Sequence, residues 1–360
     1  MSNLRSKLFL LIGIVIFASI LFSLVYTASK NPVYSDEYVF YKVSRELPAY
    51  SSSANWILVD NPDFITLKSE QVWGRDIIVK VYKLAYEKPV WVHPPLDSVL
   101  VYPFVKITDN IKDLRAIPIT LTIGSLILLF LILRRRLSPI LAAITISPVL
   151  LFDEITMFGG IYFYHEAFML FFLILTIYLS EVKSRWKYVA GAALALSKLP
   201  AVAFLLPLMI KDRDWKYLLS ATVIIPYWIA TWVVGGSPFY LINHWLAMSE
   251  VARTIFWAGN ILPQLGVYLI HSGLAAFIVI IIPSLYFAVK EKQYWLLVAA
   301  LIAVVLGVGW AGIYYQMIEM VFLGIIALSY LVYHLNEYFQ RPGIKEDIFS
   351  HIPRRGNALP

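Results

Sequence analysis

The chain contains no cysteine, so disulfide bonds and thiolate metal sites are excluded. Charged residues are also scarce, at 15% of the 360 positions, whereas a typical soluble domain carries about 25%. Asn-x-Ser/Thr acceptor sites, P-loops, zinc-like His/Cys spacings and Gly-x-Ser-x-Gly elbows are all missing from the sequence. Hydrophobic residues instead make up 60% of the chain, and the mean hydropathy is +0.72. This composition is typical of a membrane protein.

Apolar runs of about twenty residues recur along the chain, and each can cross a hydrocarbon core about 30 Å thick. Alternation at period two, the pattern of membrane β-barrels, is absent. The first run, residues 8–28, follows Arg5 and Lys7 and exceeds the apolar region of a secretory signal, which has about 7–15 residues. We therefore predict an all-α polytopic membrane protein that begins with an uncleaved anchor.

The net charge of +7 comes largely from short basic loops, the pattern of cytoplasmic loops in membrane proteins, and nucleic-acid binding is not expected. If residues 188–210 crossed once, every later basic loop would fall on the wrong side. Splitting this segment at Ser197-Lys198-Leu199-Pro200 into two half-spans restores the agreement, and proline suits a first helical turn. The other crossings are predicted at 116–133, 137–152, 156–180, 217–234, 262–289, 294–308 and 313–333.

This assignment predicts about ten crossings with both termini cytoplasmic. Residues 1–334 form the transmembrane domain, and residues 335–360 form a basic cytoplasmic tail. Residues 29–115 are too polar to span and form a large first extracytoplasmic loop with interfacial helices.

Three surface helices are expected in that loop, one of them over residues 73–87, and the other two carry motifs. One begins at Ser35, a preferred N-cap, with Asp36 and Glu37 in the first turn, where acids suit the helix dipole. The other begins at His93-Pro94-Pro95, because proline is favoured at the first helical position. Asp97 lies off its predicted apolar stripe, which consists of Leu96, Val99, Leu100 and Pro103.

At these residues the chain resembles the membrane-embedded glycosyltransferases of the GT-C fold that use polyprenyl-phosphate sugars. It looks most like the branch that holds the protein O-mannosyltransferases and the bacterial aminoarabinose transferases. Those families carry an acidic pair in the first outer loop, matched by Asp36-Glu37, and the mannosyltransferases carry a later segment matched by His93-Pro94-Pro95-Leu96. The segment 197–200 looks like a variant of their Leu-Thr-Lys-Gly turn. The similarity covers residues 1–210 and lacks the soluble domain of many relatives, so it does not indicate the acceptor.

The resemblance implies an inverting transfer at the extracytoplasmic face of the cell membrane. An acceptor hydroxyl attacks the anomeric carbon of a polyprenyl-phosphate-linked sugar, such as dolichyl phosphate mannose, and the lipid phosphate leaves. Asp36 would be the general base, with Glu37 and His93 as further catalytic candidates. Lys198 and Arg253 are candidates to bind the donor phosphate. The acceptor would be a protein, a glycan or a lipid.

Further candidates come from acidic residues elsewhere in the chain. Asp153 and Glu154 lie in a predicted outer loop and could orient the acceptor or hold a divalent cation, although no metal site or cofactor is required. Glu166 and Glu319 lie inside predicted spans, where ionisable residues are costly and therefore functional candidates. We predict that all four residues bind the acceptor or contact the residues that bind it.

Each candidate also has a plainer interpretation. Asp36 and Glu37 fit an ordinary helix start, and His93 fits a capping or interfacial histidine. Lys198 fits a side chain that extends to the lipid–water interface, and Glu319 fits a structural hydrogen-bond network. A transporter with a polar midplane site is the main alternative function, since broken helices and intramembrane acids are common there. A non-catalytic scaffold is a third possibility.

Overall fold

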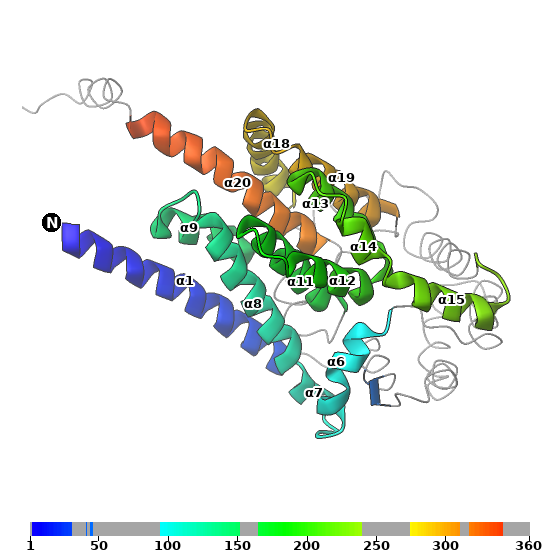
Figure 1. Ribbon diagram of the computed structural model, residues 1–360. Coiled ribbons are helices and arrows are strands. Elements are labelled where there is room, and N and C mark those ends of the chain that lie inside the picture. The colour runs from blue at the N-terminus through cyan, green and yellow to red at the C-terminus, as the bar shows by residue number, and fades with distance from the viewer. Residues whose placement is uncertain are drawn as a thin grey trace, which may run out of the picture.

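The computed structural model describes residues 2–30, 41, 44–45, 94–151, 165–239, 274–309 and 317–340. Within these ranges the chain is helical and contains no strand, which confirms the predicted all-α class for this part of the protein (Figure 1). In the part of the chain that the structure describes, three segments are long and apolar enough to cross a membrane, namely Gly13–Lys30, Ile111–Leu133 and Val321–Phe339.

Most described helices lie largely within the predicted apolar runs, but the predicted span 217–234 is divided between two helices, and the last helix continues beyond the predicted end at residue 333 to Gln340. The long ones are α1 (Ser2–Lys30), α8 (Ala116–Leu133), α11 (His165–Glu181), α18 (Leu274–Lys290), α19 (Tyr294–Gly309) and α20 (Met317–Gln340). The short ones are α6 (Leu96–Val105), α7 (Ile111–Leu114), α9 (Pro139–Ile146), α12 (Lys187–Ser197), α13 (Leu205–Asp212), α14 (Tyr217–Ala221) and α15 (Ile224–Gly235). Two 3-10 turns, η1 (Ser147–Leu151) and η2 (Leu199–Phe204), complete the described elements.

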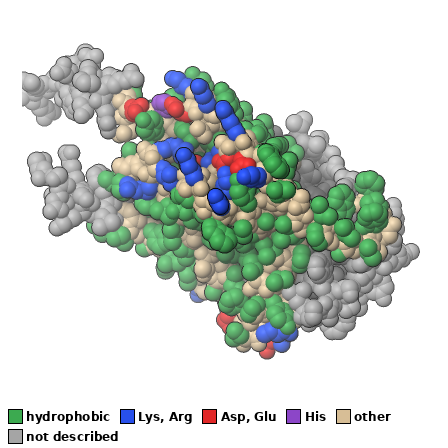
Figure 2. All heavy atoms as spheres, viewed as in Figure 1, with side chains coloured by type: hydrophobic (Ala, Val, Ile, Leu, Met, Phe, Trp, Pro, Cys, Tyr) green, Lys and Arg blue, Asp and Glu red, His purple; other side chains and the backbone are tan. Residues whose placement is uncertain are grey.

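The core lies where α8, α11, α12 and α20 pack together. Leu129, Ile174, Leu194 and Ile325, one from each helix, are completely buried. The outside of the same bundle is also apolar, as the hydrophobic side chains in Figure 2 show; Phe22, for example, is 70% exposed. An apolar surface of this extent is stable when lipid covers it.

The chain reverses direction at Lys198, as the split of residues 188–210 predicts. Helix α12 ends at Ser197, Lys198 is extended (φ −153°, ψ 138°), and η2 begins with Pro200 in its first turn. At the other end of the two arms, Lys187 Nζ lies 2.6 Å from Asp212 Oδ2. The arms therefore form a hairpin whose tip is Lys198.

The short basic loops meet at one end of the bundle, which we call the basic end (Figure 2). Glu181, the last residue of α11, forms ion pairs with Arg135, Arg136 and Lys211. The nitrogen–oxygen distances are 3.9, 3.6 and 3.1 Å, respectively. The Arg136 guanidinium also lies over the Tyr330 ring of α20, 4.5 Å from its centroid. These contacts join the loops that follow α8, α11 and α13, as the charge pattern predicts.

Helix α6 begins directly after Pro95, as predicted, but its environment differs from that of a surface helix. Val99 and Leu100 of the apolar stripe are 53% and 43% exposed, whereas Asp97 is fully buried. The face that carries Asp97 is thus packed against the protein and does not face water. A helix beside lipid turns its apolar side outward, and its polar residue needs polar partners inside the bundle.

Candidate functional site

Four buried ionisable side chains lie together, and we call them the acid–lysine cluster. They are Asp97 of α6, Glu166 of α11, Lys198 at the hairpin tip and Glu319 of α20, each at most 2% exposed. The sequence predicts the last three as candidates. It does not single out Asp97, although an acid in the first turn of an otherwise apolar helix was an available signal.

An ion pair forms the centre of the cluster. Lys198 Nζ donates a hydrogen bond to Glu166 Oε1. Glu166 lies in the first turn of α11, where the helix dipole favours a negative charge. Burying either charge alone would be costly, so each makes the burial of the other tolerable. Lys198 is therefore not a side chain that reaches the lipid–water interface, which corrects that plainer interpretation.

Asp97 and Glu319 surround the ion pair. Each interacts electrostatically with both Glu166 and Lys198. Glu166 Oε2 and Glu319 Oε1 are buried and have no hydrogen-bond partner among the described residues. The cluster thus sets three carboxyl groups against one ammonium group, an excess that a low-dielectric interior relieves by holding a proton or by binding a donor or a cation.

The cluster lies deep within the bundle, away from the basic end. At 1.5 Å per residue, Glu166 is about 22 Å along α11 from Glu181, and Lys198 is about 16 Å along α12 from Lys187. Helix α8 runs about 27 Å from its first residue to the basic end. The cluster therefore lies far from the basic end, toward the opposite end of the bundle.

Residues that follow the first-loop motifs pack against helices that carry the cluster. Tyr41, which comes after Asp36-Glu37 in the sequence, is buried together with Val101 of α6 and Phe168 of α11. Helix α6, which follows His93-Pro94-Pro95, packs against α12, and Pro94 itself is buried. Six predicted site residues lie outside the described residues, namely Asp36, Glu37, His93, Asp153, Glu154 and Arg253.

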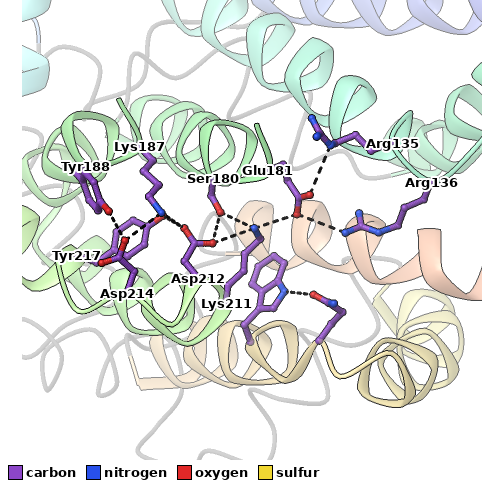
Figure 3. A network of polar contacts seen from close by, with 12 residues as sticks. Arg135, Arg136, Ser180, Glu181, Lys187, Tyr188, Lys211, Asp212, Asp214 and Tyr217 are labelled. Carbon is purple, nitrogen blue, oxygen red and sulfur yellow. Dashed lines mark hydrogen bonds and ion pairs between the residues drawn. The ribbon is translucent and has the colours of Figure 1, made fainter. Parts of the chain in front are cut away.

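A second polar network lies at the basic end (Figure 3). Asp212 accepts hydrogen bonds from Lys187 Nζ (2.6 Å), Ser180 Oγ (2.5 Å) and the Tyr217 hydroxyl (2.8 Å). Asp214 accepts a hydrogen bond from the Tyr188 hydroxyl. The segment Asp212-Arg213-Asp214 matches an Asp-x-Asp motif. Its two carboxylates, however, accept the hydrogen bonds that hold the base of the hairpin together.

These bonds change the acidity of both carboxyl groups. Burial alone would raise the pKa of Asp212, but the hydrogen bonds from Lys187 and Ser180 and the charge of Lys211 outweigh burial and lower it. The hydrogen bond from Tyr188 lowers the pKa of Asp214. Both groups therefore stabilise the fold in their ionised form.

This network predicts an acid-sensitive fold. A carboxyl group whose pKa is lowered by folding stabilises the protein above its unfolded pKa of about 3.9 and loses that effect as the pH falls further. In micelles, we expect the midpoint temperature of unfolding to fall as the pH is lowered below about 4. Asp212→Asn should make this fall shallower and should also lower the midpoint temperature at pH 7. Asp113→Asn, at an exposed carboxylate of the opposite end, is the control; an equally steep drop in the Asp212→Asn protein would contradict the prediction.

The acid–lysine cluster carries groups suited to proton transfer and to anion binding. No group of three or more His, Asp or Glu residues within the described ranges is arranged to hold a metal ion. The cluster does offer a buried ammonium group for an anion and carboxyl groups for proton transfer.

Comparisons of the chain with protein-family models, curated proteins and solved structures found no match.

Proposed function

We propose that the protein is an inverting membrane glycosyltransferase that moves a sugar from a polyprenyl phosphate to an acceptor hydroxyl, with Asp36 as general base. One observation carries this proposal. The described parts of three segments far apart in the sequence meet at α6, the helix that follows His93-Pro94-Pro95: Tyr41, after the acidic pair, packs with Val101 of α6, and Asp97 of α6 interacts with Lys198 at the hairpin tip. These are the segments in which the chain resembles the GT-C transferases.

The membrane arrangement that we propose is the GT-C-like bundle of about ten crossings with the basic end in the cytoplasm. The gathering of the basic loops at one end and the apolar outer surface support it. The acid–lysine cluster then lies below the extracytoplasmic end, at a depth where a lipid carrier can present its sugar phosphate. Water is scarce at that depth, and positive charge acts strongly on an anion there.

We assign the roles as follows. Asp36 accepts the proton of the attacking hydroxyl, and Glu37 and His93 assist it. Arg253 and Lys198 stabilise the departing lipid phosphate, for which Lys198 must exchange Glu166 for the phosphate, since the ion pair occupies it in the described structure. Glu319, Asp153 and Glu154 belong to the acceptor side.

The deciding experiment is an assay of the purified protein in nanodiscs with a panel of polyprenyl-phosphate-linked sugars. We expect time-dependent release of free polyprenyl phosphate with at least one sugar, and transfer of that sugar to an added membrane extract. A protein that releases no lipid phosphate from any donor, although it binds them, would not be a transferase of this class.

The proposed sidedness can be tested directly because the chain has no cysteine of its own. Ile107, in the turn after α6, is 82% exposed at the end opposite the basic loops. We expect Ile107→Cys to react with a membrane-impermeant maleimide in intact cells. Lys183→Cys, at the basic end, should react only after permeabilisation. The reverse pattern would place the cluster on the cytoplasmic side and remove the basis for the proposed reaction.

A transporter is the second candidate, favoured by a buried acid–lysine pair at a broken helical segment. The two functions predict different results in sealed proteoliposomes. A transporter moves its substrate or protons across the bilayer without consuming a lipid-linked sugar. A transferase consumes the donor on one side and moves nothing across.

A further inference from the structure

A cavity of about 480 Å³ opens at the basic end, beside the loop that joins α11 to α12. Its lining includes four cationic side chains and two anionic ones: Lys183, Arg185, Lys187, Lys211, Glu181 and Asp212. Lys187 and Lys211 are paired with Asp212 and Glu181. The proposed transferase reaction does not use this cavity, which lies at the far end of the bundle from the acid–lysine cluster.

The remaining two cations have no such partner. Lys183 and Arg185 are exposed, and neither side chain forms an ion pair with any residue that the structure describes. Ser184, between them, accepts a hydrogen bond from the Trp186 backbone N–H through its hydroxyl oxygen, which leaves the hydroxyl hydrogen available to donate. Two positive charges and a hydroxyl at the mouth of a cavity are donors suited to a phosphate group.

The backbone at this end holds basic residues in an unusual conformation. Lys183, Arg213 and Lys292 have φ values of 57°, 51° and 61°, and they are the non-glycine residues with positive φ in the described chain. Glycine or asparagine usually occupies such positions after a helix, because a side chain there is strained. All three positions are occupied by basic residues, whose positive charge interacts favourably with the dipole of the preceding helix.

Exposed aromatic and apolar side chains lie in or next to the loops at the base of the hairpin, one of which lines the cavity. Trp186 and Trp215, in the two loops at the base of the hairpin, are 69% and 63% exposed. Tryptophan is enriched where hydrocarbon meets headgroups, since its ring is apolar and its N–H is polar. Val182 and Val189, on either side of the cavity loop, are also exposed and offer contact for acyl chains. These neighbours favour a lipid over a soluble anion.

We propose that this cavity binds the headgroup of an anionic phospholipid, with Lys183 and Arg185 contacting the phosphate and the exposed tryptophans lying at headgroup level. Basic pockets at the membrane surface recognise lipid phosphates by the same chemistry. The proposal goes beyond the glycosyltransferase function and does not depend on it.

The test uses the whole protein in neutral detergent micelles, so that no charged bilayer surface contributes. Short-chain phosphatidylglycerol, phosphatidylcholine and glycerol phosphate are titrated separately, and bound ligand is counted by native mass spectrometry. We expect saturable binding of one phosphatidylglycerol per protein and much weaker binding of phosphatidylcholine. Glycerol phosphate that binds as tightly as the lipid would show a site for a soluble anion and overturn the proposal, as would the absence of saturable binding.

Matched double variants locate the site. Lys183→Gln with Arg185→Gln should weaken phosphatidylglycerol binding by about 30-fold, since each cation near a lipid phosphate contributes about five-fold. Lys290→Gln with Lys292→Gln removes the same charge at the same end, and Lys292, like Lys183, has a positive φ. This control should change binding less than two-fold. Equal loss in both variants would mean diffuse attraction without a site, and Arg185→Gln alone provides a milder change if the double variant is unstable.

Discussion

Replacing Lys198 with methionine is expected to lower the free energy of unfolding by about 3–5 kcal/mol. The change keeps the volume of the side chain but removes the ammonium group that pairs with Glu166. Glu166 is 2% exposed, so its carboxyl group would be left buried without the charge that offsets the cost of dehydration. Denaturant unfolding in mixed micelles, followed by tryptophan fluorescence, measures the effect.

Two further variants separate the ion pair from other effects of the substitution. The double variant Lys198→Met with Glu166→Leu should recover most of the lost stability, because removing both members of a buried pair costs much less than removing one. Lys290→Met, at an exposed position, should stay within about 0.5 kcal/mol of the parent protein. If Lys198→Met proved as stable as this control, the buried ion pair would not exist in the folded protein.

The same double variant also tests whether the cluster contributes to function. Its stability should be close to that of the parent, so a loss of transfer activity in it could not be attributed to unfolding. Full activity in the double variant would assign Glu166 and Lys198 a purely structural role and remove Lys198 from the donor site.

Replacing Asp36 with asparagine is expected to lower the rate of sugar transfer by about 10²–10⁴-fold. Asparagine has the same shape as aspartate but cannot accept the proton of the attacking hydroxyl. Donor binding should be unchanged, because the base acts on the acceptor and not on the lipid phosphate. The rate of polyprenyl phosphate release at saturating donor measures the effect, and donor affinity is measured separately.

Asp113→Asn is the matched control for this prediction. It makes the same chemical change at a carboxylate near the start of α8, where Thr108 and Asn110 are its hydrogen-bond partners. We expect this variant to keep the parental rate. An Asp36→Asn protein that also kept it would end the assignment of Asp36 as the base, whatever the fate of the other site residues.

Local patterns in the sequence were sufficient for several helices and for the hairpin. The predicted span 116–133 coincides with α8, because an unbroken apolar run between Arg115 and Arg134 leaves little choice of boundary. The reversal at Lys198 followed from two local facts, a proline that cannot lie inside a helix and basic residues that should share one side. Such features depend on neighbouring residues only, so they can be read without knowing the fold.

The environment of α6 could not be read in this way. Its periodicity correctly separated the apolar stripe from Asp97, but periodicity does not say whether the apolar side faces lipid or protein. In α6 the stripe residues Val99 and Leu100 are exposed, and the face that carries Asp97 and Val101 is buried against the rest of the protein. The orientation of α6 therefore depends on its packing against the rest of the bundle, including α12.

The sequence by itself determined the helical class of the described chain, the position of its apolar runs and the grouping of its basic loops, because run length, proline and charge act locally. Only the tertiary structure decided that Lys198 pairs with Glu166, thirty-two positions away, and that Asp97 and Glu319 join them. It also decided that the loops at the basic end enclose a cavity. These contacts depend on which helices pack together, and the choice of packing partner is not encoded in the pattern of any one segment.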